Sequence, residues 1–406
     1  MNSQLAAHAM LRSTLAAVRG VRHSMQLPLS ARIASYRDRR GLPPNDPGIE
    51  PVIQEGIGWL GTAQDNANPI DGGIARHFSL VTGWSPSYPE TTGYIVPTLL
   101  EYGRLYKDAA VRQRAKRALD WLVSIQFPDG GFQGGPIGAE PLVPVTFNTG
   151  QILLGLAAGV RDFGDEYRQA MARAADWLVK TQDPDGCWRA HPTPFAHPGE
   201  KAYETHVAWG LFEAARVAPE SGYANAALAN VHWALTRQKQ NGWFSHCCLT
   251  DATQPLTHTL GYVLRGLVEA YLFTQDAKLL HACRKTADGL LSALQADGFL
   301  PGRLRADWSA AVPWACLTGT AQIAICWLLL YRQTDDLRYR DAAYAANRYV
   351  RRTVALTGPP TVRGGVKGSF PVDGSYGQYE YLSWACKFLV DSLLLERALR
   401  ESKRSS

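Results

Sequence analysis

Two helical patterns of apolar and polar positions follow each other along this chain. In residues 111–125, apolar residues recur every three or four positions, and basic residues fill the positions between them. This spacing predicts an amphipathic helix with one solvated face. In the stretch after Thr149, almost every residue is apolar or small, which predicts a helix that is buried on all sides.

The two patterns recur together at intervals of about 57 residues, so the chain is an array of internal repeats. In most copies a phrase that begins with Trp ends with Gln five positions later, and a turn such as Pro-Asp-Gly follows it. The copies begin at Trp59, Trp121, Trp177, Trp233 and Leu290, and Tyr349 marks a sixth copy without the Gln. Each repeat is therefore one amphipathic helix, one turn and one buried helix.

Six such hairpins predict an all-α protein, an (α/α)₆ toroid with an outer ring of amphipathic helices and an inner ring of buried helices. The N-termini of the inner helices then meet at one mouth of the barrel. An open solenoid of the same hairpins is the structural alternative. We expect the toroid domain to span residues 46–400, after a basic leader over residues 1–45. No unbroken apolar run is long enough to predict a membrane span.

The leader accounts for the charge of the chain. The formal net charge is +6, and the leader, with its seven arginines and the single acid Asp38, supplies all of it. An amphipathic helix near residues 11–25 could contact an anionic membrane surface or a partner protein. The simpler alternative is a helix that packs on the outside of the ring. No run of basic residues interleaved with aromatic ones indicates nucleic-acid binding.

The seven cysteines include no C-x-x-C pair, and several lie in apolar helical stretches. This pattern is typical of buried free thiols in a reducing compartment. We therefore expect a cytoplasmic protein, and the leader leaves open a peripheral position at the inner membrane. His246, Cys247, Cys248 and Asp251 come closest to a zinc set, but adjacent ligands rarely surround one tetrahedral ion. We expect neither a metal nor another cofactor.

The repeated Gln, followed by a turn and an aromatic residue, resembles the QW repeats of squalene–hopene cyclases and protein prenyltransferase β subunits. The resemblance implies that Gln126, Gln182, Trp188, Gln238 and Trp243 tie an outer helix to the next turn. The Asp-x-Asp-Asp motif with which those cyclases protonate their substrate is absent. In fold alone, the toroid also resembles uronate C5-epimerases, polysaccharide lyases, unsaturated glucuronyl hydrolases and N-acylglucosamine epimerases. The fold does not choose among these activities.

Three loop–helix junctions bring chemically active side chains to the expected mouth. Trp and Tyr rings suit the apolar faces of sugars, while Arg, Lys, His and Glu bind hydroxyl and carboxylate groups. A basic mouth on a neutral ring indicates an acidic ligand such as a uronate polymer. The predicted substrate-binding residues are Arg76, His77, Trp84, Tyr88, Trp209, His258, Arg363, Lys367, Tyr379 and Glu380. Tyr94 and Tyr262, which lie further along their helices, are expected to line the cavity.

The predicted catalytic residues are Glu90, Tyr203, Glu204, His206 and Tyr376. Proton abstraction next to a uronate carboxylate needs a base, an acid and cations that stabilise the enolate. This mouth supplies all three, which indicates an epimerase or lyase that acts on an acidic polysaccharide or oligosaccharide. Hydrolysis by two carboxyls, Glu90 with Glu204 or Glu380, is the second option.

Other classes and simpler roles stay open at this point. A terpenoid cyclase or prenyltransferase-like enzyme and a non-catalytic glycan-binding protein of polysaccharide assembly are the alternatives from other classes. Glu90 and Glu204 stand where an acid can cap a helix and interact favourably with its dipole. His206 and His258 can be hydrogen-bonded core residues.

Overall fold

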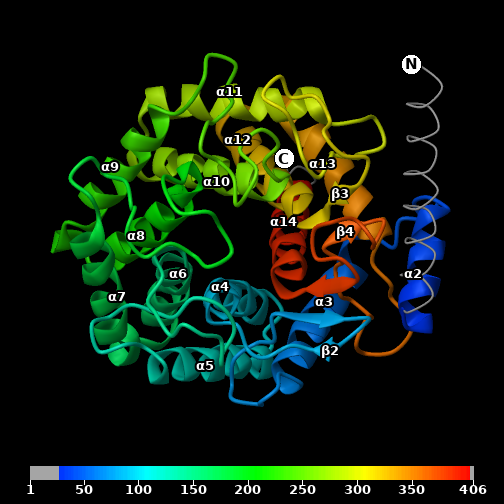
Figure 1. Cartoon of the computed structure of the whole chain (residues 1–406), viewed down its shortest axis with the longest axis horizontal. Coiled ribbons are helices and arrows are strands. Elements are labelled where there is room, and N and C mark those ends of the chain that lie inside the picture. Colours follow the sequence, from blue (N-terminus) through cyan, green and yellow to red (C-terminus); the bar gives the residue numbers. More distant parts are fainter. Residues whose placement is uncertain (1–26, 403–406) are drawn as a thin grey trace, which may run out of the picture.

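The computed structural model describes residues 27–402, in which helices form a closed double ring (Figure 1). The outer helices are α3 (Ile49–Asp65), α5 (Ala109–Ser124), α7 (Arg168–Thr181), α9 (Tyr223–Leu235), α11 (Ala277–Ala293) and α13 (Leu337–Arg352). The inner helices are α4 (Pro89–Leu105), α6 (Thr146–Phe163), α8 (Thr205–Val217), α10 (Thr257–Thr274), α12 (Leu317–Thr334) and α14 (Ser383–Ser402). The predicted toroid of six hairpins is confirmed.

The burial of the two kinds of helix agrees with their sequence patterns. Every residue of α6 from Thr146 to Val160 is buried. In α5 the buried residues, such as Val111 and Ala115, are separated by exposed or half-exposed ones. Each inner helix packs against the next, and α14 packs back against α4 and α3. The ring is therefore closed, and the open solenoid is not formed.

The repeated Gln residues connect neighbouring outer helices. Gln182 Nε2 donates to the carbonyl of Gly186 in the following turn at 3.0 Å and to that of Ala226 in α9 at 2.9 Å. Gln126 makes the same pair of bonds to Gly130 and Ala170. Each Gln amide therefore joins the following turn to the next outer helix by two hydrogen bonds. The structural role that the QW resemblance implied is the observed one.

Glycine allows the inner helices to approach each other closely. A Cβ atom at Gly93 in α4 would lie 2.4 Å from Cα of Ile152 in α6, and one at Gly155 would lie 2.4 Å from the carbonyl oxygen of Gly93. No side chain fits between backbones at that separation. The backbones of α4 and α6 therefore lie in direct contact.

Short strands at the mouth are a feature that the helical pattern did not predict. β1 (His77–Ser79) lies between β2 (Gly83–Trp84) and β5 (Glu380–Leu382) in one antiparallel sheet, and β3 (Ala315–Cys316) pairs with β4 (Ser369–Phe370). Strand pairing satisfies backbone groups of these partly buried loops. Because β1 and β5 belong to the first and last repeats, their pairing also closes the ring at the mouth.

The end of the basic leader packs on the toroid. Helix α2 (Leu29–Arg39) places Asp38 Oδ1 2.6 Å from Lys367 Nζ, and both side chains are buried. Asp38 also accepts from the backbone N–H of Val372 at 2.9 Å. The expected boundary at residue 45 therefore separates segments that contact each other. The helix predicted near residues 11–25 lies outside the described residues.

Three 3₁₀ turns complete the described part of the chain: η1 (Asp165–Tyr167), η2 (Ala202–Glu204), which leads into α8, and η3 (Pro219–Ser221).

All seven cysteines are buried and form no disulfide, as their spacing predicted. Among the described residues, no helix has the length and apolar character needed to cross a bilayer.

Candidate active site

The inner helices run parallel, so their N-termini lie at one mouth, where a cavity of about 100 Å³ opens. Half of its lining residues lie just before or within the first turns of these helices. The lining residues are Arg76, Tyr88, Glu90, Phe147, Thr193, Phe195, Tyr203, Leu249, His258, Tyr262, Tyr376 and Trp384. Within this described lining, Glu90 is the one carboxyl and Arg76 the one permanent cation.

Glu90 is a buried carboxyl with a pKa near neutrality. Helix α4 starts with Pro89, and Glu90 follows in its first turn. Burial raises the pKa of Glu90 to about 7, against the opposing effects of a Tyr88 hydrogen bond and of Arg76. The Tyr88 hydroxyl donates to Glu90 Oε2 at 2.5 Å. A pKa near 7 lets one carboxyl act as acid or base at physiological pH.

Arg76 lies among aromatic rings and polar neighbours. Its guanidinium carbon lies 5.0 Å from the centre of the Trp384 ring and 5.8 Å from that of Phe195. Its Nη1 lies 2.9 Å from His77 Nδ1 and 3.6 Å from Glu380 Oε2. Burial and the charge of Arg76 lower the pKa of His77 to about 3, so this ring is neutral and accepts a hydrogen bond from Arg76.

His258 and Tyr376 occupy another side of the wall. His258 Nδ1 lies 2.9 Å from Gln322 Oε1, and burial lowers the pKa of His258 to about 4, so the ring is neutral at pH 7. Because an amide oxygen accepts, we assign the proton to Nδ1, which leaves Nε2 as an acceptor. Trp384 Nε1 donates to the Tyr376 hydroxyl at 2.8 Å. The ring of Tyr262, 4.3 Å from His258, completes this side, as predicted for a lining residue.

Some buried polar atoms at this wall have no hydrogen-bond partner among the described residues. They include the hydroxyl of Tyr203 and the amide nitrogen of Gln322, behind His258. An unpaired buried donor costs on the order of 1–3 kcal/mol. A ligand with hydroxyl groups, or ordered water, would satisfy such groups.

Tyr203 lines the cavity, whereas the neighbouring Glu204 and His206 lie behind its wall. Burial raises the pKa of Glu204 well above its usual value and lowers that of His206 well below its usual value. His206 Nδ1 lies 2.6 Å from Gln151 Oε1. Successive side chains point in different directions around η2 and the start of α8, so only Tyr203 of the three faces the cavity. Of these three predicted catalytic residues, the cavity lining therefore includes Tyr203 alone.

The small sheet places three predicted binding residues beside the cavity rather than in its lining. His77, Trp84 and Glu380 lie on β1, β2 and β5. The ring of Trp84 packs 5.5 Å from Trp59, and His77 Nε2 lies 3.5 Å from Glu380 Oε1. His77 and Glu380 therefore contact Arg76, whereas Trp84 packs on other aromatic rings.

Four predicted binding residues have other partners. Trp209 lines a second cavity with Arg265. Arg363 is exposed and lies 2.9 Å from Glu55 of α3. Lys367 pairs with Asp38, and Tyr379 packs against Ala31 and Val372. Arg76 is thus the one permanent cation in the described cavity lining, and Arg363 and Lys367 pair with acids that lie far away in the sequence.

The sequence pattern did not predict five of the lining residues, Phe147, Thr193, Phe195, Leu249 and Trp384. A signal for two of them was present in the repeats. Glu90, Phe147, His258 and Trp384 are each the second residue of an inner helix. That position faces the cavity in four of the six hairpins. Thr193, Phe195 and Leu249 come from long loops, for which the repeat supplies no register.

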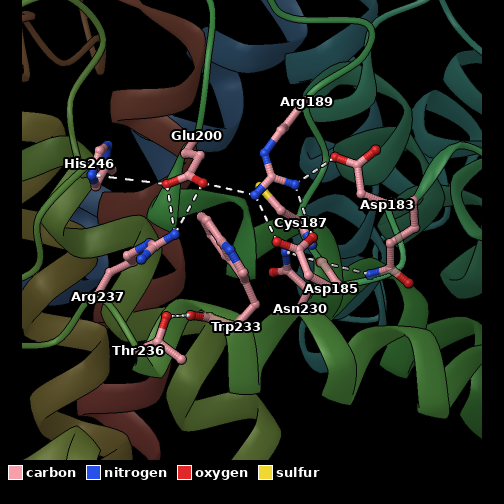
Figure 2. A network of polar contacts seen from close by, with 12 residues as sticks. Asp183, Asp185, Cys187, Arg189, Glu200, Asn230, Trp233, Thr236, Arg237 and His246 are labelled. Atoms are coloured by element: carbon pink, nitrogen blue, oxygen red, sulfur yellow. Dashed lines mark hydrogen bonds and ion pairs between the residues drawn. The ribbon is translucent and has the colours of Figure 1, made fainter.

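A network of ion pairs holds the loop that carries Thr193 and Phe195 (Figure 2). Glu200 lies at its centre, 2.8 Å from Arg189, 3.0 Å from Arg237 and 4.0 Å from His246. Exposed pairs contribute little one by one, but several that share a carboxylate restrict a loop. His246 thus faces a carboxylate, and residues 27–402 contain no group of three or more potential metal ligands.

The chain was compared with known families and structures. Residues 58–268 match the family described as the squalene–hopene cyclase C-terminal domain. No curated protein resembles the chain closely enough in sequence to count as a match.

Several solved structures have a similar fold. An unsaturated glucuronyl hydrolase specific for heparin superposes with a TM-score of 0.70 at 16% identity, over 88% of this chain and 99% of that one. The unsaturated glucuronyl hydrolase of Bacillus sp. GL1 gives 0.66 at 15% identity, over 86% and 97%. Cellobiose 2-epimerase from Bacillus thermoamylovorans gives 0.64 at 12% identity, over 84% and 95%. At these identities the likeness shows a shared fold.

Proposed function

We propose that this chain, which belongs to the squalene–hopene cyclase C-terminal domain family, is an enzyme that transfers a proton at the terminal uronate residue of an acidic glycan. The observation that carries the proposal is the presence in one cavity of a carboxyl with a pKa near 7 and a guanidinium. Abstraction of a proton next to a carboxylate requires such a base and such a cation. Toroids of similar fold include a glucuronyl hydrolase and an epimerase.

In the proposed reaction the carboxylate of Glu90 takes the proton from C5 of the uronate. The electron pair of the broken C–H bond moves into the substrate's carboxylate and forms an enolate, whose charge Arg76 stabilises. In an epimerase, Tyr203 or Tyr376 returns a proton to the opposite face of C5. Solvent then reprotonates that tyrosine and takes the proton from Glu90.

In a lyase the enolate collapses differently. For a uronate at the reducing end, whose O4 links it to the rest of the chain, the electron pair of the enolate forms the C4–C5 double bond and breaks the C4–O4 bond, and O4 takes a proton from a tyrosine. Solvent then reprotonates that tyrosine and takes the proton from Glu90. Burial raises the pKa of both Tyr203 and Tyr376 well above the usual value, so these hydroxyls hold protons at neutral pH. They are therefore suited to the acid's part rather than the base's part.

The size of the cavity supports action at the end of a chain. At about 100 Å³ the cavity lies below the range of about 300–1,000 Å³ typical of sites that enclose a whole ligand. It would therefore receive one end of a glycan rather than an extended segment. The remainder of the glycan would extend past the exposed Phe195.

The carboxyl groups favour proton transfer over two-carboxyl hydrolysis. Hydrolysis requires two carboxyls that flank the scissile bond. In the described lining Glu90 has no such partner, because Glu204 lies behind the wall and Glu380 faces Arg76 and His77.

Cyclisation of a hydrocarbon is the second candidate, favoured by the family match and by the aromatic wall. A half-protonated Glu90 could protonate an alkene, and rings such as Trp384 stabilise cations. The small volume, the Arg76 guanidinium and the unpaired polar atoms speak for a sugar instead. Non-catalytic glycan binding is the third candidate, and measurements of turnover separate it from the first.

The test is incubation of the full chain with uronate-terminated oligosaccharides in deuterated water. An epimerase incorporates deuterium at C5, and a lyase produces an unsaturated product that absorbs in the ultraviolet. The Glu90→Gln variant should lower the rate on the order of 10²–10⁴-fold, while the Glu55→Gln variant, at a half-exposed residue of outer helix α3 outside the cavity lining, should retain it. Release of reducing ends with neither signal would contradict proton transfer. Turnover of a polyprenyl diphosphate without any glycan reaction would favour the second candidate.

A further inference from the structure

A second cavity, of about 420 Å³, lies inside the barrel between later turns of the inner helices. It is lined from α4, α6, α8, α10 and α14, and it shares no lining residue with the first cavity. Arg104 and Arg161 of its wall belong to the last turns of α4 and α6. The second cavity therefore opens toward the C-terminal ends of the inner helices, at the mouth opposite the candidate active site.

Two buried ion pairs lie at this cavity. Lys387 of α14 is 2% exposed, and its Nζ lies 2.6 Å from Asp391 Oδ2. Arg265 of α10 is 13% exposed, and its Nη2 lies 2.8 Å from Glu269 Oε1. On each helix the carboxylate follows the cation by one turn. Buried pairs of this kind often contribute no more stability than apolar residues of the same size, so the stability of the barrel does not explain them.

An aromatic surface completes the wall. The Arg265 guanidinium lies 4.1 Å from the ring centre of Trp209, and Trp209 Nε1 donates to Glu213 Oε1 at 3.2 Å. Arg161 lies 2.7 Å from the other oxygen of the same carboxylate. The lining therefore combines four cations and three carboxylates with an indole ring: Arg104, Arg161, Arg265, Lys387, Glu101, Asp162, Asp391 and Trp209.

We propose that this second cavity binds a neutral saccharide. An anionic ligand would face Asp391 and Asp162, and a cationic ligand would face Lys387 and Arg265. Hydroxyl groups donate to carboxylates and accept from ammonium and guanidinium groups, so they are compatible with every member of this wall. Aromatic rings pack against the apolar faces of sugar rings. The volume lies in the range of small-molecule sites and suits about one or two sugar rings.

A layer of side chains separates the two cavities. The His206 ring lies 4.5 Å from Tyr262 at the first cavity and 5.0 Å from Trp209 at the second, and Phe388 packs beside both His206 and Tyr262. The sites also differ in the number of charged groups, because the first lining holds one carboxyl and one permanent cation, whereas the second holds several of each. The proposal for the second site therefore does not rest on the reaction proposed at the first.

Calorimetric titration of the full chain with cellobiose and maltose tests the proposal. We expect a neutral disaccharide to bind with a dissociation constant on the order of millimolar. The rim variant Arg161→Met should weaken it at least about 10-fold through lost hydrogen bonds to a charged group, and Trp209→Phe should weaken it as well. Arg168→Met, an exposed change on outer helix α7, is the matched control.

The Glu90→Gln variant separates this site from the first. Binding that Glu90→Gln leaves unchanged and Arg161→Met weakens supports the proposal, whether or not any glycan is turned over. Binding that Glu90→Gln abolishes and Arg161→Met preserves would overturn it. The absence of binding heat with neutral disaccharides at about 50 mM, well above the expected constant, would overturn it too, and so would tighter binding of glucuronate or glucosamine. Arg161 is 43% exposed, so its substitution should leave the fold intact, which a thermal melt checks.

Discussion

The Tyr88 hydroxyl donates a hydrogen bond to Glu90 Oε2 at 2.5 Å, and both side chains are buried in the wall of the mouth cavity. Burial raises the pKa of Glu90 to about 7, and this hydrogen bond acts in the opposite direction because it stabilises the carboxylate. Tyr88 is therefore a positioning residue that sets the pH at which Glu90 becomes a base.

The first prediction concerns the Tyr88→Phe variant. Loss of the hydrogen bond should raise the pKa of Glu90, so the acidic limb of kcat/KM should move to higher pH. The limb moves in this direction because only the ionised carboxylate of Glu90 abstracts a proton. A higher pKa means that a higher pH is needed to ionise it. A pH–rate profile on a uronate-terminated substrate measures the shift. Tyr339→Phe, at an outer helix where the hydroxyl contacts Asp288, is the control. An acidic limb at the wild-type position in Tyr88→Phe would refute the role of Tyr88.

The second prediction concerns stability and pH. Burial raises the folded-state pKa of Glu90 and of Glu204 above their unfolded values. The contribution of each group to the free energy of unfolding is therefore fully present below the unfolded pKa near 4.5. For Glu90 it is lost as pH rises through about 7. The difference in unfolding free energy between wild type and Glu204→Gln should therefore become less favourable to wild type as pH rises from 4.5 to 8. Urea denaturation over this pH range measures it, and a difference that stays constant would show that Glu204 is not buried in the folded chain.

The third prediction compares two ion pairs of helix α2. Asp38→Asn should lower the free energy of unfolding by about 3 kcal/mol, because it leaves the buried Lys367 ammonium without its partner. Arg39→Gln, which removes the exposed partner of Asp373, should cost below about 1 kcal/mol. Chemical denaturation of both variants gives the two values. Equal costs would mean that α2 is not docked as described.

The fourth prediction compares two helical glycines. Gly93→Ala places a Cβ 2.4 Å from Cα of Ile152 and should destabilise the fold by about 1–3 kcal/mol. Gly58→Ala in α3 meets no atom within 4 Å, so it should stabilise by up to about 1 kcal/mol through helix propensity. Thermal or urea unfolding of both variants reveals the opposite signs. A neutral Gly93→Ala would show that α4 and α6 do not touch.

The fold could be predicted because the sequence pattern that specifies each hairpin is local and recurs along the chain. Trp177 and Gln182 stand at the end of one amphipathic stretch, and the same spacing recurs in the other copies. Apolar periodicity then decides which helix of each hairpin is buried. Closure of the ring followed from the number of repeats, and the pairing of Phe78 with Tyr381 shows how the structure achieves it at the mouth.

The site could be predicted only in part, because the direction of a side chain depends on partners that are distant in sequence. Arg363 and Lys367 belong to one Gly-rich loop, yet Arg363 reaches Glu55 and Lys367 reaches Asp38. Nothing near either residue in the sequence distinguishes them from Arg76, which does line the cavity. Glu90 and His258 were identified because each lies at the start of an inner helix, and the starts of the inner helices align from repeat to repeat.

The antiparallel pairing of β1 with β5 also determines when the mouth is assembled during synthesis. Arg76 leaves the ribosome well before Trp384, on whose ring its guanidinium packs in the folded chain. Before β5 is made, β1 has no strand partner from the last repeat. The contact between β1 and β5 closes a very long loop of chain, and the entropic cost of closing a loop grows with the length of that loop. A chain that terminates before β5 would lack Trp384 and the strand that closes the mouth, so an interrupted translation product would carry hairpins but no complete cavity.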